Sequence, residues 1–359
     1  MARQSRTRSK LERLLKAPGW NPGTRAALEQ LIRTGAGQGL PVVFDFDNTI
    51  VWGDIGEAVL AVLARSGALT PQSLPPALCP PLNVPGRGRV NLETCADILE
   101  YYEALLAPTA HGRRDPNPLG NGYVWATEVL AGLSVAEITQ AAREAFNASP
   151  SGRIRQITVT TSRTSVPAPF FYPEIVELIG TLLDAEFTVW VVSASNVWSV
   201  RWMVLQGLNP ALQKHGFERS IPPEQVVGIS TLLADSAGRL YKDSVLVRED
   251  SSYAQLSPER LRSLRATQHL QFPVPVYSGK VGCIFDALGR EPYLCVGDSP
   301  ADHPMLAFSQ NRLWIARLEK PESQRATKML MKRTGRANWL VQGVRTAEDP
   351  GFYSEPCRL

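Results

Sequence analysis

The chain has 359 residues, of which 44% are hydrophobic and 20% are charged, and its formal net charge is +4. This composition excludes a disordered polar chain and predicts one large core with a smaller inserted or flanking module. Because no apolar run approaches the roughly 20 residues of a membrane-spanning helix, we expect no membrane span.

Residues 1–40 predict a helical N-terminal extension, in which PGWNPG separates two helical patterns. Its first residues are basic but lack the apolar core of a secretory signal, so we expect a cytoplasmic protein. The sequence carries no nucleic-acid-binding motif, and basic residues elsewhere alternate with acids. A solvated basic tail is therefore favoured over a nucleic-acid partner. Five cysteines without close CxxC spacing predict reduced structural thiols.

The segment PVVFDFDNTIVWGD, residues 41–54, is an apolar run that stops at Asp45 and Asp47, with Thr49 close behind. A short apolar run predicts a buried strand, and alternate residues that leave a strand point the same way. The two carboxylates can therefore share one target. They repel each other unless a cation compensates, and a hard divalent ion with oxygen ligands would do so.

Residues 55–165 predict a largely helical cap. Helical patterns cover residues 59–69, 91–106, 123–133 and 135–146. The Pro-rich stretch 70–89 predicts a loop, because its prolines are incompatible with regular helix. The sequence RIRQITVT then marks the return of the chain to the core.

The remaining chain predicts an α/β fold with a parallel sheet. A helix over PEIVELIGTLLDA precedes the strand FTVWVV, which is the alternation typical of parallel sheets. Residues 226–247 predict a hairpin around Ser236, Ala237 and Gly238. NRLWIAR predicts a further core strand, and PESQRATKMLMKR predicts a final amphipathic helix.

Three polar segments follow the predicted strands of this region. FTVWVV ends at Ser193 and Ala194, Lys280 opens a predicted helix, and PYLCVGDSPADHPML carries Asp298 and Asp302. In open parallel sheets, ligands bind beyond the carboxyl ends of the strands. We therefore expect these segments to meet the first two carboxylates in one crevice.

In this order the motifs resemble those of the haloacid dehalogenase-like (HAD) hydrolases: DxDxT, a Ser or Thr after a strand, a Lys, and GDxxxD. They match at Asp45, Asp47 and Thr49, at Ser193, at Lys280, and at Gly297, Asp298 and Asp302. The resemblance covers roughly residues 41 to 317. It implies a Rossmann-like core at 41–54 and 166–359, with a mainly helical cap at 55–165 inserted between the first and second motifs. The cap placement resembles that of the phosphoserine phosphatase-like branch, and its size and the VVSAS turn resemble phosphorylcholine phosphatases.

The resemblance implies a nucleophile and a proton donor. Asp45 would attack phosphorus to give an aspartyl-phosphate that water later hydrolyses. Asp47 would protonate the leaving group and then take a proton from water. An acid at position 47 argues against dehalogenation, because a halide leaves without protonation.

The resemblance also implies ligands for a metal and for the phosphoryl group. Mg²⁺ would be held by the Asp45 side chain, the Asp47 backbone carbonyl and Asp298. The phosphoryl oxygens would be bound by Thr49, Ser193, Ala194 and Lys280, with Thr49 also supporting the nucleophile loop. Asp302 would orient Lys280 or the groups around the metal.

Two readings of the leaving-group residues stay open. Asp54 is either a ligand for a substrate amine, as the acidic residue at this place in phosphoserine phosphatases implies, or the N-cap of the next helix. Trp52 could add a cation–π face. The acids and aromatics Glu100, Tyr101, Tyr102, Glu103, Tyr123 and Trp125 are either a box for a quaternary ammonium or helix core and solvated edge.

The sequence therefore predicts a magnesium-dependent phosphomonoester hydrolase acting on a small, amine-bearing substrate resembling phosphocholine or phosphoserine. One alternative is a phosphotransferase that passes the same aspartyl-phosphate to an acceptor alcohol. Another is a non-catalytic protein that binds a phosphoryl ligand or nucleic acid. The sequence does not define the oligomeric state.

Overall fold

The computed structural model describes residues 15–107, 122–150, 152–159, 164–335, 337–347 and 349–356. Its central element is a seven-stranded sheet in the order β16-β15-β14-β13-β1-β8-β9. The strands are β1 (Pro41–Phe44), β8 (Thr188–Asn196), β9 (Val226–Ile229), β13 (Leu294–Gly297), β14 (Asn311–Arg317), β15 (Trp339–Arg345) and β16 (Gly351–Tyr353). All neighbours are parallel except β15 and β16, which are antiparallel. The predicted α/β class with a mainly parallel sheet is confirmed.

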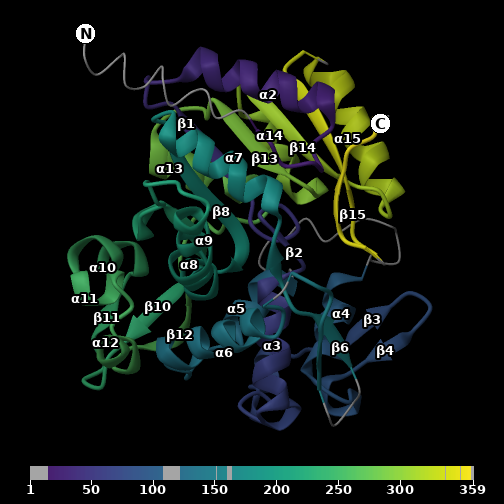
Figure 1. Cartoon of the computed structure of the whole chain (residues 1–359). Helices are drawn as coiled ribbons and strands as arrows, with labels where there is room; N and C mark the ends of the chain where they lie inside the picture. The colour runs from purple at the N-terminus through teal and green to yellow at the C-terminus, as the bar shows by residue number, and fades with distance from the viewer. Residues whose placement is uncertain are drawn as a thin grey trace.

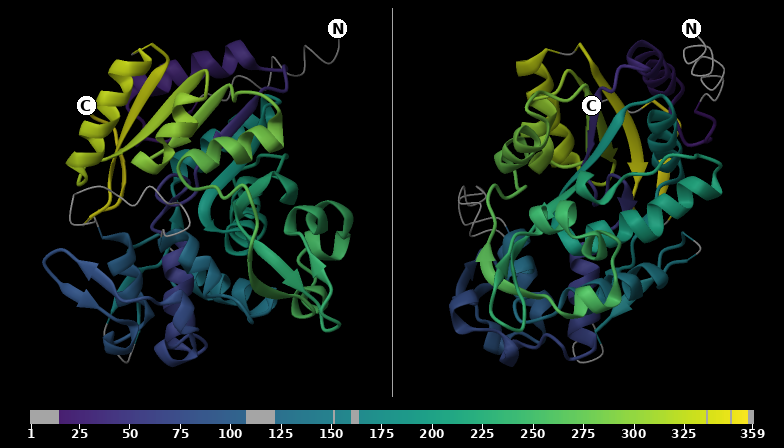
Figure 2. Two further views of the ribbon diagram at one scale, coloured as in Figure 1. Left: turned by 180° about the vertical axis from the view of Figure 1, so that it is seen from behind. Right: turned by 90° about the vertical axis from the view of Figure 1, so that its left-hand side faces the viewer.

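Helices cover both faces of this sheet (Figures 1 and 2). On one face lie α2 (Pro22–Gly35) and α7 (Pro173–Asp184), and on the other lie α13 (Ser278–Leu288), α14 (His303–Ala307) and α15 (Pro321–Thr334). The four residues of β1 are all buried. Val42 and Phe44 pack into one apolar cluster, whereas Val43 packs into a second. This alternation is expected of a strand that has helices on both sides.

The mainly helical cap lies between the first and second motifs, as predicted, and below the sheet in Figure 1. It contains α3 (Ile55–Arg65), β3 (Leu82–Val84), β4 (Gly88–Val90), α4 (Ile98–Leu106), α5 (Gly122–Glu128), α6 (Val135–Asn147), β5 (Gln156–Thr158) and β6 (Ser165–Pro167). The Pro-rich stretch is more ordered than predicted, because 3₁₀ turns at Pro71–Ser73 and Pro76–Leu78 precede the hairpin of β3 and β4. The domain limits 41–54, 55–165 and 166–359 stay a prediction.

Three predicted cap helices have different limits in the structure. The helix predicted at 123–133 is α5, which ends at Glu128. The other two differ at their starts. The predicted helix 59–69 begins at Ile55, where Asp54 caps it, and ends at Arg65. The predicted helix 91–106 is interrupted: a 3₁₀ turn spans Leu92–Thr94, and α4 starts only after its own cap, Asp97. In both cases a capping carboxylate sets the start, because it accepts hydrogen bonds from the first free N–H groups.

A second module follows β9. It holds a three-stranded sheet of β10 (Thr231–Ala234), β11 (Leu240–Tyr241) and β12 (Arg265–Leu270) with helices α10 (Asp243–Glu249), α11 (Ser251–Ala254) and α12 (Pro258–Arg262). The predicted hairpin around Gly238 corresponds to β10 and β11, whereas its first four residues form β9 of the central sheet. The module reaches the cap through a 2.9 Å backbone hydrogen bond from Val135 N to Leu264 O, and the two lie side by side in Figure 2.

The rest of the chain closes the structure around the sheet. The predicted strand and helix at NRLWIAR and PESQRATKMLMKR are β14 and α15, but the last two strands were not predicted. Gln342 of β15 is fully buried and accepts a 2.8 Å hydrogen bond from Asn21 N, which ties the N-terminal segment to the C-terminal strands. Remaining elements are β2 (Val51–Trp52), β7 (Phe170–Phe171), α8 (Val197–Met203), a π-helix at Val204–Leu208, α9 (Asn209–Lys214), and 3₁₀ turns at Pro223–Gln225 and Pro300–Asp302.

Among the described residues, no helix has both the length and the apolar character needed to cross a bilayer. The earlier of the two helical patterns predicted in residues 1–40, together with the basic residues of that tail, lies outside the described residues. The later pattern is α2, which starts at Pro22 after Asn21 accepts hydrogen bonds from Gly23 N and Thr24 N.

Candidate active site

The four motifs meet at the carboxyl edge of the sheet. Asp45 follows β1, and the two strands that flank β1 are β13 and β8. Asp298 follows β13, and Ser193 lies on β8. Lys280 lies in the first turn of α13, which packs against β8. The parallel arrangement therefore places side chains that are far apart in sequence around one point.

Lys280 bridges two aspartates. Its Nζ lies 2.5 Å from Asp45 Oδ1 and 2.6 Å from Asp302 Oδ1, and the lysine is only 1% exposed. Burial and the neighbouring carboxylate of Asp302 raise the pKa of Asp45, although Lys280 opposes the shift. Asp302 uses its second oxygen to accept from Asp298 N and Ser299 N. The contact between Asp302 and Lys280 is the one that the proposed orienting role requires.

Thr49 connects the first and fourth motifs. Its hydroxyl lies 3.0 Å from Asp45 Oδ2 and 3.3 Å from Asp298 Oδ1. The other oxygen of Asp298, Oδ2, lies 2.9 Å from Nη1 of Arg317, the last residue of β14. One oxygen from each of Asp45 and Asp298 thus faces a common point beside Thr49.

This point has the donor set of a hard divalent cation. Carboxylate oxygens of Asp45, Asp298 and Asp302 lie within 4.8 Å of one another and all three residues are buried. Burial, partly offset by Arg317, raises the pKa of Asp298 to about 6, as expected where negative charge lacks full compensation. Next to Asp298, the Nε of Arg317 and the hydroxyl of Tyr172 are buried without a hydrogen-bond partner among the described residues. The residues fit a metal site.

Asp47 lies on the other side of the nucleophile position and accepts three hydrogen bonds. Its Oδ2 accepts from Ser193 Oγ at 3.1 Å and from Ser195 Oγ at 2.7 Å, and its Oδ1 accepts from Ile55 N at 2.8 Å. Burial, with a contribution from Asp54, raises the pKa of Asp47 to about 7. A carboxyl group with this pKa can both donate and accept a proton near neutral pH.

The sequence analysis missed Ser195. The apolar run predicts a strand that ends at Val192, but β8 continues to Asn196. Ser193 and Ser195 are alternate residues of one strand, so their side chains point the same way, and this spacing could have revealed the second hydroxyl. Ala194 is the residue between them, and its side chain packs against an apolar cluster that includes Val124. Its predicted contact with phosphate stays a prediction.

Two further acids lie beside Asp47: Asp54, directly before the cap, and Glu57 in its first helix, together called the cap acids. Asp54 Oδ1 accepts from Glu57 N at 3.0 Å, so the N-cap reading is confirmed, while the cation-binding reading stays a prediction. Burial and the carboxylate of Glu57 raise the pKa of Asp54 to about 7, and burial and the carboxylate of Asp47 raise the pKa of Glu57 to about 7. Burial and then Asp54 and Glu57 also raise the pKa of Tyr102. Glu57, three residues after the cap on the same helix face, was missed.

The other leaving-group candidates make packing contacts and hydrogen bonds within the protein. Trp52 is 5% exposed, stacks on Phe170 at 5.1 Å between ring centroids, and donates from Nε1 to Thr346 O. Tyr101 donates to Pro80 O, and Trp125 donates to Leu78 O. Their rings pack together at 5.5 Å between centroids. These residues fit the helix-core reading.

The acids flanking the two tyrosines of α4 also have structural partners. Glu100 accepts from Ala96 N at 2.8 Å, and Glu103 lies 3.8 Å from Arg87 in an exposed ion pair. On this helix, Tyr102 lies within electrostatic reach of Asp54 and Glu57, and Glu103 contributes to the raised pKa of Glu57. Tyr123 lies within electrostatic reach of Tyr102, and the box for a quaternary ammonium stays a prediction.

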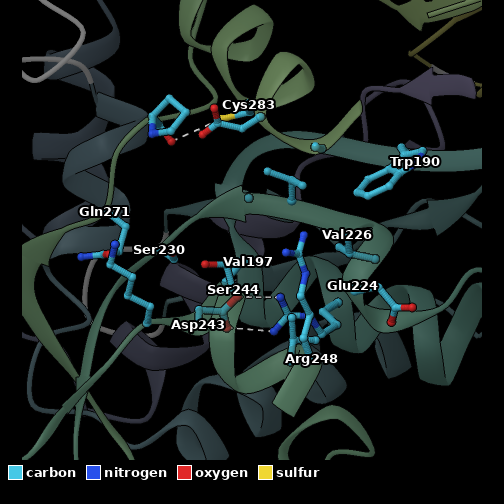
Figure 3. A pocket seen from close by; sticks show the side chains of 18 of the residues that line it. Trp190, Val197, Glu224, Val226, Ser230, Asp243, Ser244, Arg248, Gln271 and Cys283 are labelled. Atoms are coloured by element: carbon cyan, nitrogen blue, oxygen red, sulfur yellow. Dashed lines mark hydrogen bonds and ion pairs between the residues drawn. The ribbon is translucent and has the colours of Figure 1, made fainter. Parts of the chain in front are cut away.

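A separate cavity of about 310 Å³ lies between β9, α10 and α13 (Figure 3). Figure 3 shows Cys283 at one end and Asp243 and Arg248 at the other. None of the motif residues Asp45, Asp47, Ser193, Lys280 and Asp298 is among the described residues that line it. The cavity is thus distinct from the crevice that the four motifs form.

No protein-family model matches the sequence. The chain is 24% identical over 309 residues to a phosphorylcholine phosphatase of Pseudomonas aeruginosa, an alignment that covers 84% of this chain and 81% of the relative. A crystal structure of a conserved protein of unknown function from Anaerococcus prevotii superposes with a TM-score of 0.62 at 18% identity, covering 96% of this chain and 98% of that one. Phosphoserine phosphatase in its apo form superposes with a TM-score of only 0.35 at 13% identity, over 80% of this chain and 90% of that one.

Proposed function

We propose that this chain is a haloacid dehalogenase-like hydrolase of the phosphatase type, as its similarity to a phosphorylcholine phosphatase supports, and that it hydrolyses a small phosphomonoester whose alcohol carries a cationic group. The reaction runs through an aspartyl-phosphate on Asp45 and depends on Mg²⁺. The observation that carries this proposal is the position of Asp45 between Lys280 and Thr49, with Asp298 across the metal position.

The nucleophile is prepared by its neighbours. Lys280 binds one oxygen of Asp45 and supplies a fixed positive charge where the phosphoryl group accumulates negative charge. A carboxylate oxygen of Asp45 attacks phosphorus, so a bond forms between Asp45 and phosphorus while the ester bond breaks. Asp302 keeps Lys280 in place through a 2.6 Å ion pair.

Asp47 moves the proton in both halves of the reaction. Its raised pKa of about 7 supports a protonated fraction that can donate to the leaving alkoxide. The carboxylate formed in that step then takes a proton from the water that attacks the aspartyl-phosphate. Free Asp45, the alcohol and inorganic phosphate are the products.

Asp45, Asp298 and the backbone carbonyl of Asp47 would hold the metal, for which Mg²⁺ is the proposed ion. When bound, a divalent cation offsets the charge of the phosphoryl oxygens and of the nucleophile together. Ser193 contacts Asp47 through its hydroxyl, and we propose that the same hydroxyl turns to a phosphoryl oxygen when substrate binds.

The cap acids support a cationic leaving group. Asp54, Glu57 and Asp47 place three carboxyl groups within electrostatic reach of one another, beside the ring of Tyr102. Carboxylates next to an aromatic ring suit a quaternary ammonium or a primary amine. The relative from Pseudomonas aeruginosa is named for phosphorylcholine, which agrees with this choice. We propose that residues 55–165 form the cap that reads this group.

A substrate panel tests the proposal. Purified protein is assayed against phosphocholine, phosphoethanolamine, phosphoserine, a neutral sugar phosphate and an aryl phosphate, each with Mg²⁺ or with a chelator. We expect Mg²⁺-dependent phosphate release, with the highest kcat/KM for phosphocholine or phosphoethanolamine. Added alcohols should not divert the phosphoryl group, and their phosphorylation would favour a phosphotransferase instead. A preference for the sugar phosphate would contradict the cationic leaving group.

A further inference from the structure

Arg317 enters the crevice from a strand that carries none of the four motifs. It is the last residue of β14, the neighbour of the strand that ends at Asp298. Its side chain is 21% exposed and donates from Nη1 to Asp298 Oδ2 at 2.9 Å. A guanidinium group stays charged at every pH at which the protein folds, so this ion pair does not depend on titration of the arginine.

Because of this ion pair, the two oxygens of Asp298 have different partners. Oδ2 is bound to Arg317, and Oδ1 lies 3.3 Å from the Thr49 hydroxyl. The two oxygens of Asp45 also have different partners, because Oδ1 accepts a hydrogen bond from Lys280 and Oδ2 accepts one from Thr49. Each of these two buried carboxylates therefore presents a single oxygen to the point that they share.

The arginine is not fully committed to a structural role. Its Nε is buried and has no hydrogen-bond partner among the described residues. Among the described residues, the ion pair with Asp298 is its closest charged contact, and Asp54 and Glu57 lie within electrostatic reach; these carboxyl groups offset the cost of burying most of a guanidinium group. Arg345 is the corresponding last residue of the neighbouring strand β15, but its side chain lies outside the site. Its guanidinium lies 4.4 Å from the ring centroid of Tyr353.

The number of oxygens that a carboxylate offers discriminates between divalent ions. Ca²⁺ takes about 6–8 oxygen ligands in flexible geometry and readily accepts both oxygens of one carboxylate, whereas Mg²⁺ requires a near-ideal octahedron at about 2.0–2.1 Å. A site whose carboxylates are each limited to one oxygen meets the needs of Mg²⁺ and leaves Ca²⁺ with too few ligands.

We infer that Arg317 is a positioning residue for Asp298, which limits that carboxylate to one metal-facing oxygen and thereby makes the site selective for Mg²⁺ over Ca²⁺. The inference rests on the proposed metal site of the phosphatase. It assigns to Arg317 a role that Lys280 has for Asp45.

Calorimetric titration with Mg²⁺ or Ca²⁺ alone, without substrate, tests the inference. Arg317→Met keeps most of the side-chain volume but removes the donors. We expect the ratio of the Ca²⁺ Kd to the Mg²⁺ Kd to fall by at least about tenfold, the low end of the effect of partners of metal ligands. Arg317→Lys should retain most of the ratio, because an ammonium can still bind Oδ2. Arg345→Met, at the end of the next strand, is the matched control and should leave the ratio unchanged.

Several outcomes would overturn the inference. The first is an unchanged ratio of the two Kd values in a folded Arg317→Met variant. The second is an equal rise in the Mg²⁺ and Ca²⁺ affinities of that variant, which would show only an effect of the lost charge. The third is a wild-type protein that binds neither ion. If Arg317→Met does not fold, a crystal structure of the wild-type protein soaked in Ca²⁺ decides the matter. Asp298 should bind the ion through one oxygen, and two-oxygen binding refutes the proposal. A changed ratio in a protein that hydrolyses no phosphomonoester would sink the proposed function alone.

Discussion

The hydroxyl of Ser195 donates a 2.7 Å hydrogen bond to Oδ2 of Asp47. Together with Ser193 and the backbone N–H of Ile55, it fixes the carboxyl group that is proposed to protonate the leaving group. The same three contacts lower the pKa of Asp47, but burial outweighs them and the net pKa is about 7. The position of this group is thus set by hydrogen bonds and its protonation by burial.

Replacing Asp47 with Asn should separate the two halves of the reaction. An aryl phosphate leaves without protonation, so its first half should survive, whereas water would attack the aspartyl-phosphate without a general base. We expect a rapid release of about one equivalent of phenol, followed by turnover reduced by about 10²–10⁴-fold. Stopped-flow absorbance measures both phases. Steady turnover at the wild-type rate would show that Asp47 is not the proton carrier, and Ser195→Ala, which keeps the carboxyl group, should show no such burst.

Asp54→Asn distinguishes the N-cap from a cation ligand, since Asn caps a helix as well as Asp does. The variant should unfold at the wild-type temperature. Its KM for phosphocholine should rise by about tenfold, which corresponds to ~1.4 kcal/mol, while its KM for an aryl phosphate stays the same. Glu57→Gln should have the same effect. Equal KM changes for both substrates would leave Asp54 as a cap only.

The acids of the cap also predict a pH dependence of substrate choice. Asp54 and Glu57 have pKa values raised to about 7, so both lose negative charge as the pH falls through neutrality. Affinity for a cationic substrate should therefore be higher above pH 7 than below it. Asp47 titrates in the wild-type protein and in an Asp54→Asn and Glu57→Gln double variant alike, so the ratio of the wild-type to the variant kcat/KM for phosphocholine isolates the effect of the two acids. This ratio should rise from pH 6 to pH 8, and a ratio that is constant with pH would contradict a cation site at Asp54 and Glu57.

A buried ion pair near the cavity of Figure 3 should control stability rather than activity. Arg201 donates two hydrogen bonds, of 2.9 and 2.7 Å, to Asp243, and their side chains are only 2% and 5% exposed. Asp243→Asn leaves the guanidinium without its counter-ion, so we expect the free energy of unfolding to fall by about 3–5 kcal/mol. Urea unfolding measures it. Arg219→Gln, which breaks an exposed pair with Glu186, should cost under about 1 kcal/mol.

The same pair gives a signed dependence on pH. Although burial raises the pKa of Asp243, Arg201 outweighs it, and the net pKa lies below its ordinary value of 3.8. Stability from the ionised carboxylate is therefore complete above the unfolded-state pKa and is lost as the pH falls through the lower, folded-state pKa. The stability difference between wild type and Asp243→Asn should shrink below about pH 4. A difference that is constant with pH would argue against an ionised Asp243.

The sheet and the four motifs could be predicted because each depends on local sequence. A short apolar run ending in Asp45 or Asp298 signals a buried strand with a polar end, and parallel pairing then brings the ends together. The strands β15 and β16 were missed because their pairing depends on distant residues, such as Gln342 and its contacts with Gly19 and Tyr353. No local pattern reports such contacts.

The residues missed at the site have a common physical reason. Arg317, Glu57 and Ser195 matter through the groups they face across the crevice, and facing is a property of the fold. Arg317 lies 19 positions from Asp298 in the sequence, at the end of a strand whose preceding four residues, Leu313 to Ala316, are apolar. The structure places Arg317 beside Asp298 and within electrostatic reach of Asp54 and Glu57.

Trapping the covalent intermediate tests the central claim most directly. The protein is mixed with substrate and Mg²⁺, quenched in acid within one turnover, reduced with borohydride and digested, and the peptides are sequenced by mass spectrometry. The account predicts a reduced acyl side chain at position 45 in the wild-type protein and none in Asp45→Asn. Modification of another residue, or substrate turnover by a folded Asp45→Asn variant at the wild-type rate, would contradict it.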